Sequence, residues 1–259
     1  MTMFKAIILA AGQGTRLRPL TDEIPKCMVP FCGTTILDRQ LQNFRSYDQA
    51  LSRVAVVGGY KIEKLPKLKN IFKNINYMKS NMVSSLFSAI PFFDDKSNLI
   101  ISYGDIVYDK AVLNALVSCD TSNDINIVSY QNWFELWKLR MNNPLDDVET
   151  FKIVDGLVTE LGKKVNNINE VQGQFTGLFR ISKGKVLDLV KFYESLEQDG
   201  LYDGQTFENM YMTTFIQLLI DDGWRVGHIP INGGWLEIDS VHDLEAYNAV
   251  NMKNKLIQF

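Results

Sequence analysis

The chain has 259 residues, which is enough to bury the core of one large domain. Its hydrophobic content of 46% and charged content of 22% are ordinary for a soluble globular protein. The formal net charge of −3 argues against nucleic acid as a partner, because polynucleotide binding selects a basic face.

The cysteines and the N-terminal residues indicate where the protein works. Cys27, Cys32 and Cys119 lack metal-ligand spacing, and an odd number without a secretion signal favours reduced thiols. Phe4–Ala11 is an apolar run of strand length, and no segment approaches the roughly 20 apolar residues of a membrane helix. We therefore expect a cytoplasmic protein with no membrane insertion.

The first half of the chain alternates strand and helix patterns. Short, nearly all-apolar runs, typical of strands buried on both faces, occur at Phe4–Ala10, Arg53–Gly59 and Asn98–Gly104. Between them, Thr34–Phe44 and Asn81–Ile90 carry apolar residues at helical spacing. This alternation predicts an α/β fold with a parallel sheet and helices on both of its faces.

From about residue 126 the strand patterns follow one another. Strands are expected at Asn126–Tyr130, Thr150–Val154, Leu157–Leu161 and Phe175–Ile181. Asp155-Gly156 is a hairpin signal between two of them. Later segments predict helices at Lys185–Leu196 and Thr206–Asp222, a strand at Trp224–Ile229, and a last helix from Asp239 with Ser240 as its N-cap.

The segment Leu9–Thr21, followed by Pro25-Lys26, carries the strongest chemical signal. A buried strand leads into a glycine-rich turn whose backbone N–H groups can face phosphate oxygens. Arg16 and Lys26 add charges suited to phosphate. The run lacks the Gly-Lys-Ser/Thr of a P-loop and the third glycine of a dinucleotide fingerprint. A bare Gly-x-Gly also fits an ordinary strand-to-helix turn, whereas the full run is far more specific.

These residues resemble the signature of nucleotidyltransferases of the sugar-phosphate and phosphocholine cytidylyltransferase type, which have a MobA-like NTP transferase fold. The resemblance implies a Rossmann-like mixed, mostly parallel sheet with helices on both faces and a smaller acceptor-binding β-rich insert. It implies one nucleotidyltransferase domain over residues 1–259, with a nucleotide-binding half near 1–125 and an acceptor-binding half near 126–235. Residues 236–259 would return to the first half.

The same resemblance assigns roles in the glycine-rich run. Arg16 would hold the β- and γ-phosphates, and Lys26 would hold the α-phosphate together with the acceptor phosphate. The base and ribose-phosphate would contact the backbone of the turn, formed by Leu9, Ala10, Ala11, Gly12, Gly14 and Thr15.

Two distant aspartates complete the predicted catalytic set of Lys26, Arg16, Asp105 and Asp239. Asp105 lies just past a buried strand, where open α/β sheets place their ligands. Each aspartate also suits an ordinary helix N-terminus, but the resemblance implies that both are metal ligands. Two carboxylates suit an oxygen-seeking Mg²⁺, which is the expected cofactor.

Asn81 bears on the choice of nucleotide. The segment Lys79–Leu86 resembles the Asn-containing helix start of cytidylyltransferases, and Asn81 could read a pyrimidine edge or cap the helix. Ser85 and Gly59 are expected beside the base. The Glu-Lys-Pro of the sugar enzymes is absent, which favours CTP and a small acceptor.

Predicted acceptor contacts, besides Lys26, come from Lys163, Gln174, Trp133 and Glu237. Lys163 either holds the phosphoryl end of the acceptor or is a solvated hairpin lysine. Trp133 and Trp137 stand four residues apart, so they form either part of a cage for a quaternary ammonium or part of the core.

The sequence thus predicts a Mg²⁺-dependent cytidylyltransferase that joins CMP from CTP to a small acceptor and releases pyrophosphate. Candidate acceptors are phosphocholine, an aminoalkylphosphonate, or a phosphorylated amino acid or amide such as phosphoglutamine. By family likeness, the product would serve surface polysaccharide or lipid decoration. The alternatives are a sugar-1-phosphate nucleotidyltransferase using UTP or dTTP, and a non-catalytic nucleotide-sensing module. The sequence does not decide whether the chain forms a homodimer.

Overall fold

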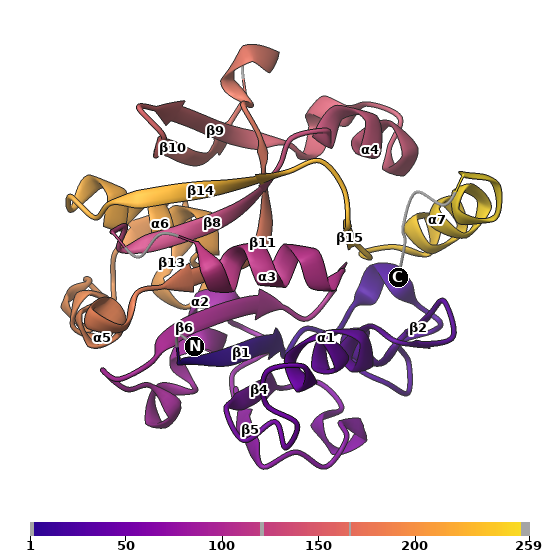
Figure 1. The fold of residues 1–259 in the computed structure, drawn as a ribbon, viewed down its shortest axis with the longest axis horizontal. Coiled ribbons are helices and arrows are strands. Elements are labelled where there is room, and N and C mark those ends of the chain that lie inside the picture. The colour runs from indigo at the N-terminus through magenta and orange to yellow at the C-terminus, as the bar shows by residue number, and fades with distance from the viewer. Residues whose placement is uncertain (1–2, 120–121, 166, 255–259) are drawn as a thin grey trace.

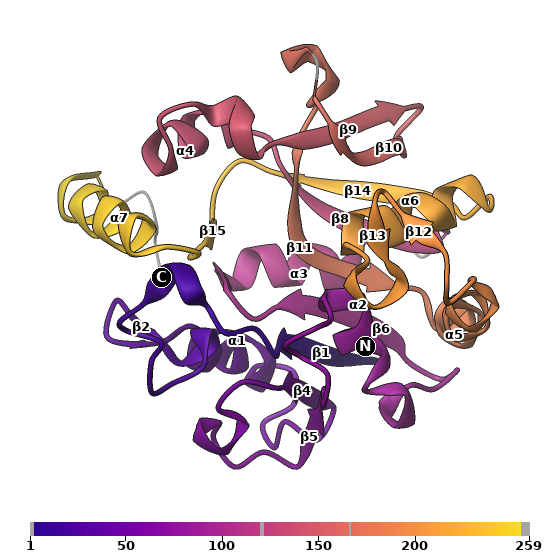
Figure 2. The ribbon, with the colours of Figure 1, turned by 180° about the vertical axis from the view of Figure 1, so that it is seen from behind.

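The computed structural model describes residues 3–119, 122–165 and 167–254. Its centre is a nine-stranded sheet in the order β5-β4-β1-β6-β11-β8-β14-β10-β9 (Figures 1 and 2). The nine strands are β1 Phe4–Ala10, β4 Val54–Gly58, β5 Asn70–Lys73, β6 Asn98–Tyr103, β8 Ile125–Tyr130, β9 Glu149–Val154, β10 Leu157–Lys164, β11 Gln174–Ile181 and β14 Val226–Ile231.

The sheet is mixed and mostly parallel. Strands β5, β4, β1 and β6 pair in parallel, as do β8 and β14. Strands β11 and β10 run against the others, because each pairs antiparallel with both of its neighbours. The strands of the second half therefore extend the same sheet that the first half begins.

Strand β1 is apolar on both sides, so both faces of the sheet must be shielded from water, and helices cover each of them. Ala6 and Ile8 pack on the side that holds α1 Ile36–Arg45, α3 Lys110–Ser118, α4 Trp133–Arg140 and α7 Val241–Asn254. Ile7 and Leu9 point the opposite way, toward α2 Met82–Phe87, α5 Val186–Ser195 and α6 Met212–Asp221. This period of two is what a strand buried on both faces requires.

Three small two-stranded sheets lie outside the main one. The β2–β3 pair (Pro30–Phe31 and Thr34–Thr35) precedes α1, and the β12–β13 pair (Leu201–Tyr202 and Gln205–Thr206) precedes α6. The third pairs β7 Ile106–Tyr108 with β15 Trp235–Glu237. That third pairing brings the chain after β14 back to the end of β6. The ring of Tyr247 on α7 then packs edge-on against Phe31, at 6.4 Å between centroids.

Most predicted elements are present, with shifted ends. The Asp155-Gly156 hairpin is confirmed, with φ of 50° and 79°, as a tight turn between paired strands requires. The prediction that a helix begins at Thr206 was wrong. Residues 205–206 form β13 instead, and the backbone carbonyl of Glu208 accepts a hydrogen bond from Asn81 N at 2.8 Å, so α6 starts only at Met212.

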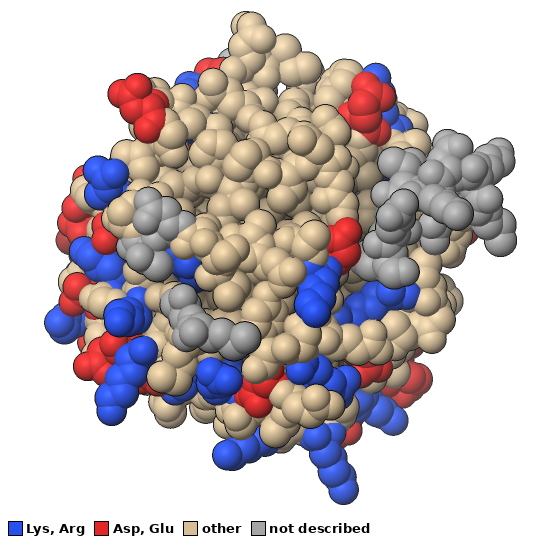
Figure 3. Space-filling model, viewed as in Figure 1, with Lys and Arg blue, Asp and Glu red and all other residues tan. Residues whose placement is uncertain are grey.

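Among the residues that the structure describes, every helix is too short or too polar to span a lipid bilayer. On the face in Figure 3, acidic and basic side chains are interspersed around the rim rather than gathered by sign.

A buried ion-pair network ties α4 to the C-terminal part of the chain. The guanidinium of Arg140, 2% exposed, contacts Glu237 Oε2 at 2.7 Å and Asp243 Oδ1 at 3.1 Å. Burial alone would lower the pKa of Arg140, but Glu237 and Asp243 raise it above its usual value. Arg140 therefore holds α4, β15 and α7 together through charge.

We predict that Arg140→Met lowers the free energy of unfolding by about 3 kcal/mol, because the buried Asp243 and the partly buried Glu237 lose their counterion. Urea unfolding at neutral pH measures the change. The matched control is Lys138→Met on the same helix, which breaks an exposed ion pair with Glu135 and should cost less than about 1 kcal/mol. Equal losses in the two variants would show that the Arg140 network does not stabilise the fold.

Candidate active site

The glycine-rich turn after β1 packs directly against the stem of Lys26. Gly14 has φ 64°, and a Cβ there would lie 2.8 Å from Lys26 Cβ. Thr21 Oγ1 donates a hydrogen bond to the Gly14 carbonyl at 2.7 Å, which closes the loop. Only glycine fits this position, so the turn and Lys26 form one local unit.

Lys26 lies between the two predicted aspartates. Its Nζ is 2.6 Å from Asp105 Oδ2 and 2.5 Å from Asp239 Oδ1, although the aspartates are far apart in sequence. Arg16, 69% exposed, forms an ion pair with the other oxygen of Asp239. The structure thus brings together all four predicted catalytic residues.

The charges in this cluster stabilise one another. Burial alone would lower the pKa of Lys26, but Asp105 and Asp239 more than offset it and raise that pKa above its usual value. Burial alone would raise the pKa of Asp239, yet Lys26 and Arg16 together lower it. Both groups stay charged at neutral pH.

Backbone pairing and a helix cap place the two aspartates. Asp105 follows β6, and its carbonyl accepts a hydrogen bond from Ile238 N at 2.9 Å beside the β7–β15 pair. Asp243 Oδ2 accepts from the backbone N of Asp239 and of Ser240, both at 2.8 Å, while Ser240 Oγ accepts from Asp243 N. The prediction that Ser240 caps the last helix is confirmed.

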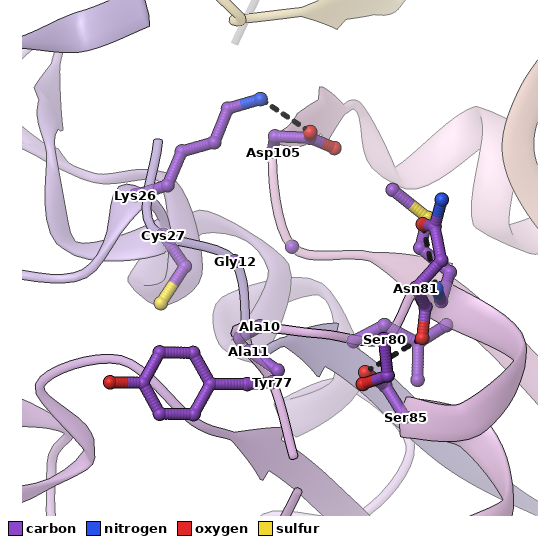
Figure 4. Close-up of a pocket in the computed structure, with 13 residues that line it drawn as sticks. Ala10, Ala11, Gly12, Lys26, Cys27, Tyr77, Ser80, Asn81, Ser85 and Asp105 are labelled. Carbon is purple, nitrogen blue, oxygen red and sulfur yellow. Dashed lines mark hydrogen bonds and ion pairs between the residues drawn. The ribbon is translucent and has the colours of Figure 1, made fainter. Parts of the chain in front are cut away.

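A first cavity of about 120 Å³ lies beside Lys26, at the carboxyl ends of β1 and β6 (Figure 4). A Cβ on Gly104 would be 2.5 Å from the Leu9 carbonyl, so a glycine is needed where the chain leaves β6. The predicted nucleotide contacts in the wall are Leu9, Ala10, Ala11, Gly12, Asn81, Ser85 and Asp105. Wall residues that the sequence reasoning missed are Cys27, Tyr77, Ser80, Met82 and Gly104.

Asn81 caps α2 and also lines the first cavity. Its Oδ1 accepts a hydrogen bond from Met82 N at 2.8 Å at the start of the helix. Gly59 is not in the wall but supports it, because a Cβ there would lie 2.5 Å from Tyr77 Cβ. Tyr77 itself lies on the loop before α2, where the sequence carries no motif.

A second cavity, of about 430 Å³, shares Asn81 and Met82 with the first. Two predicted acceptor contacts, Gln174 and Glu237, line it. Burial raises the pKa of Glu237, although the charge of Arg140 opposes that shift. Wall residues that were not predicted include Asp146, Asp147, Glu149, Tyr211 and Thr213.

The structure leaves several predicted site residues outside both cavities. Lys163 is exposed on β10 and lines neither one. Trp133 belongs to the core, and its Nε1 donates to the Val171 carbonyl at 3.2 Å. Trp137, its neighbour one helical turn away, does line the second cavity. Gly14 packs against Lys26, and neither Gly14 nor Thr15 lines a cavity. The binding roles given to these residues remain predictions.

Comparison with known proteins agrees with this architecture. Residues 6–158 match the family model described as the MobA-like NTP transferase domain. A protein of Campylobacter jejuni named CTP:phosphoglutamine cytidylyltransferase is 41% identical over 250 residues, covering 93% of this chain and 97% of that protein.

Two solved structures share the fold across nearly the full chain. The phosphocholine cytidylyltransferase of Streptococcus pneumoniae superposes with a TM-score of 0.70 at 21% identity, covering 96% of this chain and 99% of that one. The inositol-1-phosphate CTP transferase of T. maritima gives 0.69 at 18% identity, with 100% and 99% coverage. The chain belongs to the MobA-like nucleotidyltransferase family.

Proposed function

We propose that this protein transfers a cytidylyl group from CTP to a small phosphorylated acceptor and releases pyrophosphate. The observation that carries the proposal is the position of Lys26. Its ammonium group contacts Asp105, in the wall of the first cavity, and Asp239, which lies beside the second-cavity residue Glu237. A nucleotide in one cavity and an acceptor in the other would present their phosphates to the same charge.

CTP and a small acceptor are supported by the relatives. The C. jejuni protein is named for CTP and phosphoglutamine, and the pneumococcal structure for CTP and phosphocholine. Asn81, with an amide in the wall of the first cavity, supplies hydrogen-bonding groups of the kind that a pyrimidine edge needs. Phosphoglutamine is therefore the first acceptor to test.

The reaction proceeds without a covalent enzyme intermediate. An ionised acceptor oxygen attacks the α-phosphorus of CTP, a new P–O bond forms, and the bond to pyrophosphate breaks with its electron pair leaving on pyrophosphate. Lys26 would neutralise charge at the α-phosphate, and Arg16 would do so at the departing phosphates. The acceptor is ionised at neutral pH, so no general base is needed.

The donor set fits Mg²⁺. Lys26 and Arg16 are already matched by Asp105 and Asp239, so the cluster has no surplus positive charge for a triphosphate. Asp105 Oδ1 is buried and has no hydrogen-bond partner among the described residues. The described chain offers no cage of three or more metal-ligating side chains, but Mg²⁺ commonly takes one or two carboxylates with phosphate and water. Held by Asp105 and Asp239, it would supply positive charge to the phosphates.

The alternative functions have less support. A nucleotide-sensing module has no need of a lysine held between two buried aspartates, and this chain has that arrangement. A sugar-1-phosphate acceptor remains open to direct test. A cytoplasmic location and a place in surface polysaccharide or lipid decoration stay predictions from family likeness.

We expect Lys26→Met to lower kcat by about 10²–10³-fold, because one fixed positive charge at the transferred phosphate is lost. Pyrophosphate release from CTP with phosphoglutamine measures the effect, and urea unfolding confirms that the variant is folded. Lys64→Met, an exposed lysine outside both cavity walls, is the control and should retain normal turnover. A folded Lys26→Met enzyme with normal kcat would contradict the proposal.

We also expect activity to depend on CTP and on a divalent cation. CTP should exceed UTP, dTTP, ATP and GTP in kcat/KM, and chelation with EDTA should abolish pyrophosphate release until Mg²⁺ is restored. Asp105→Asn should raise the Mg²⁺ concentration needed for half-maximal rate. Preference for UTP or dTTP with sugar 1-phosphates would favour the sugar enzyme instead.

A further inference from the structure

The charged side chains that line the second cavity are all acidic. Four carboxylates line it, from Asp146, Asp147, Glu149 and Glu237, and its lining includes no Lys, Arg or His. Arg140 pairs with Glu237, and the Asn143 amide donates to Asp146. Asp147 and Glu149 form no salt bridge with a described residue, but the charges of Arg140 and Arg16 still act on Asp147 and oppose the rise that burial causes in its pKa. Glu149 is therefore the carboxylate of this cavity on which no cation of the described chain acts.

The environment of Glu149 makes its missing counterion costly. Glu149 is half-buried at the start of β9, and that burial raises its pKa, although the nearby Thr213 hydroxyl opposes the rise. A carboxylate withdrawn from water is stabilised by a nearby cation more than an exposed one is. Asp147, two residues earlier, lies more exposed at the rim of the same cavity.

Gln174 adds a second and independent feature. Its side chain is in the wall of this cavity and only 6% exposed, yet its Oε1 has no hydrogen-bond partner among the described residues. A buried amide oxygen is normally satisfied by a donor, so an unpaired one in a cavity wall indicates a place for a ligand N–H or O–H group.

Gln174 distinguishes a primary from a quaternary ammonium. Arg140 Cζ lies 4.9 Å from the centroid of the Trp137 ring, and Trp235 lies parallel to that ring at 6.4 Å. Tyr103, Phe175 and Tyr211 also line the cavity, so aromatic rings are available to either kind of cation. A quaternary ammonium, however, has no N–H to donate to the unpaired Oε1 of Gln174.

We propose that the second cavity selects acceptors with a primary ammonium group at the end opposite the phosphate, held by the carboxylates of Glu149 and Asp147 and by Gln174 Oε1. This inference rests on the proposed function, since the cavity is taken as the acceptor site. It separates the candidate acceptors: 2-aminoethylphosphonate carries a primary ammonium alone, phosphoglutamine carries one beside an α-carboxylate that the acidic wall would repel, and phosphocholine carries none.

The test compares acceptors that differ in their nitrogen. Pyrophosphate release with CTP is measured for phosphoglutamine, 2-aminoethylphosphonate, phosphocholine and ethylphosphonate. The best primary-ammonium acceptor should exceed phosphocholine and ethylphosphonate in kcat/KM by at least about tenfold, because only it pairs with both the buried oxygen and the carboxylates. Phosphocholine as the preferred acceptor would overturn the proposal.

Variants of Glu149 and Asp147 test whether these carboxylates cause the preference for a primary ammonium. Glu149→Gln and Asp147→Asn should each raise the KM for the primary-ammonium acceptor by about tenfold or more, with the KM for CTP and the rate with ethylphosphonate unchanged. Asp155→Asn, on the exposed hairpin outside the cavity, is the matched control and should change nothing. Equal losses for every acceptor would show a structural role and contradict the proposal.

Calorimetric binding without CTP separates this inference from the proposed function. If no acceptor supports pyrophosphate release, the cytidylyltransferase proposal fails. The cavity proposal then stands only if 2-aminoethylphosphonate or phosphoglutamine still binds at least about tenfold more tightly than phosphocholine, and only if Glu149→Gln removes that difference. Equal affinities for all these ligands would overturn it.

Discussion

The ammonium group of Lys26, held between Asp105 and Asp239, is the contact on which the site depends. It joins the turn after the first strand, the end of β6 and the segment before α7. Each of these groups would be costly to bury alone, so the three stabilise one another only when the chain is fully folded. Residues from both ends of the sequence thereby meet at the carboxyl ends of the central strands.

Hydrogen bonds to the backbone and further ion pairs hold Asp239 in place beside Lys26. Asp243 orients the segment of Asp239 by accepting two backbone hydrogen bonds, and Arg140 in turn pairs with Asp243 and Glu237. Helix α4 is therefore linked to the segment of Asp239 through Asp243, and the charge of Arg140 also helps to lower the pKa of Asp239.

Local patterns in the sequence were sufficient for much of this structure. The apolar run Phe4–Ala10, the Asp155-Gly156 turn and the Ser240 cap depend on neighbouring residues, and each was predicted. The start of α6 was not, because β13 and the contact of Glu208 with α2 outweigh the helical pattern. Strand order also lay beyond the sequence, since pairs such as β6 with β11 join segments that no local signal connects.

Some residues of the two cavities could likewise be predicted from the sequence, and others could not. Residues of the glycine-rich turn were predicted because their spacing carries the signal. Asp147 and Glu149 were not predicted as cavity residues, because an acidic loop before a strand looks like ordinary solvated surface in the sequence. Only the fold shows that they line the same cavity as Gln174. Lys163 was predicted either to hold the phosphoryl end of the acceptor or to be a solvated hairpin lysine, and it lies exposed on β10 outside both cavities.

The pairing of Lys26 also affects which anions the resting protein attracts. Its charge is already matched by two carboxylates, so a free phosphate or sulfate gains little by approaching and would leave those carboxylates uncompensated. The ion pairs of Lys26 thus reduce the electrostatic free energy that a free inorganic anion would gain by binding beside it.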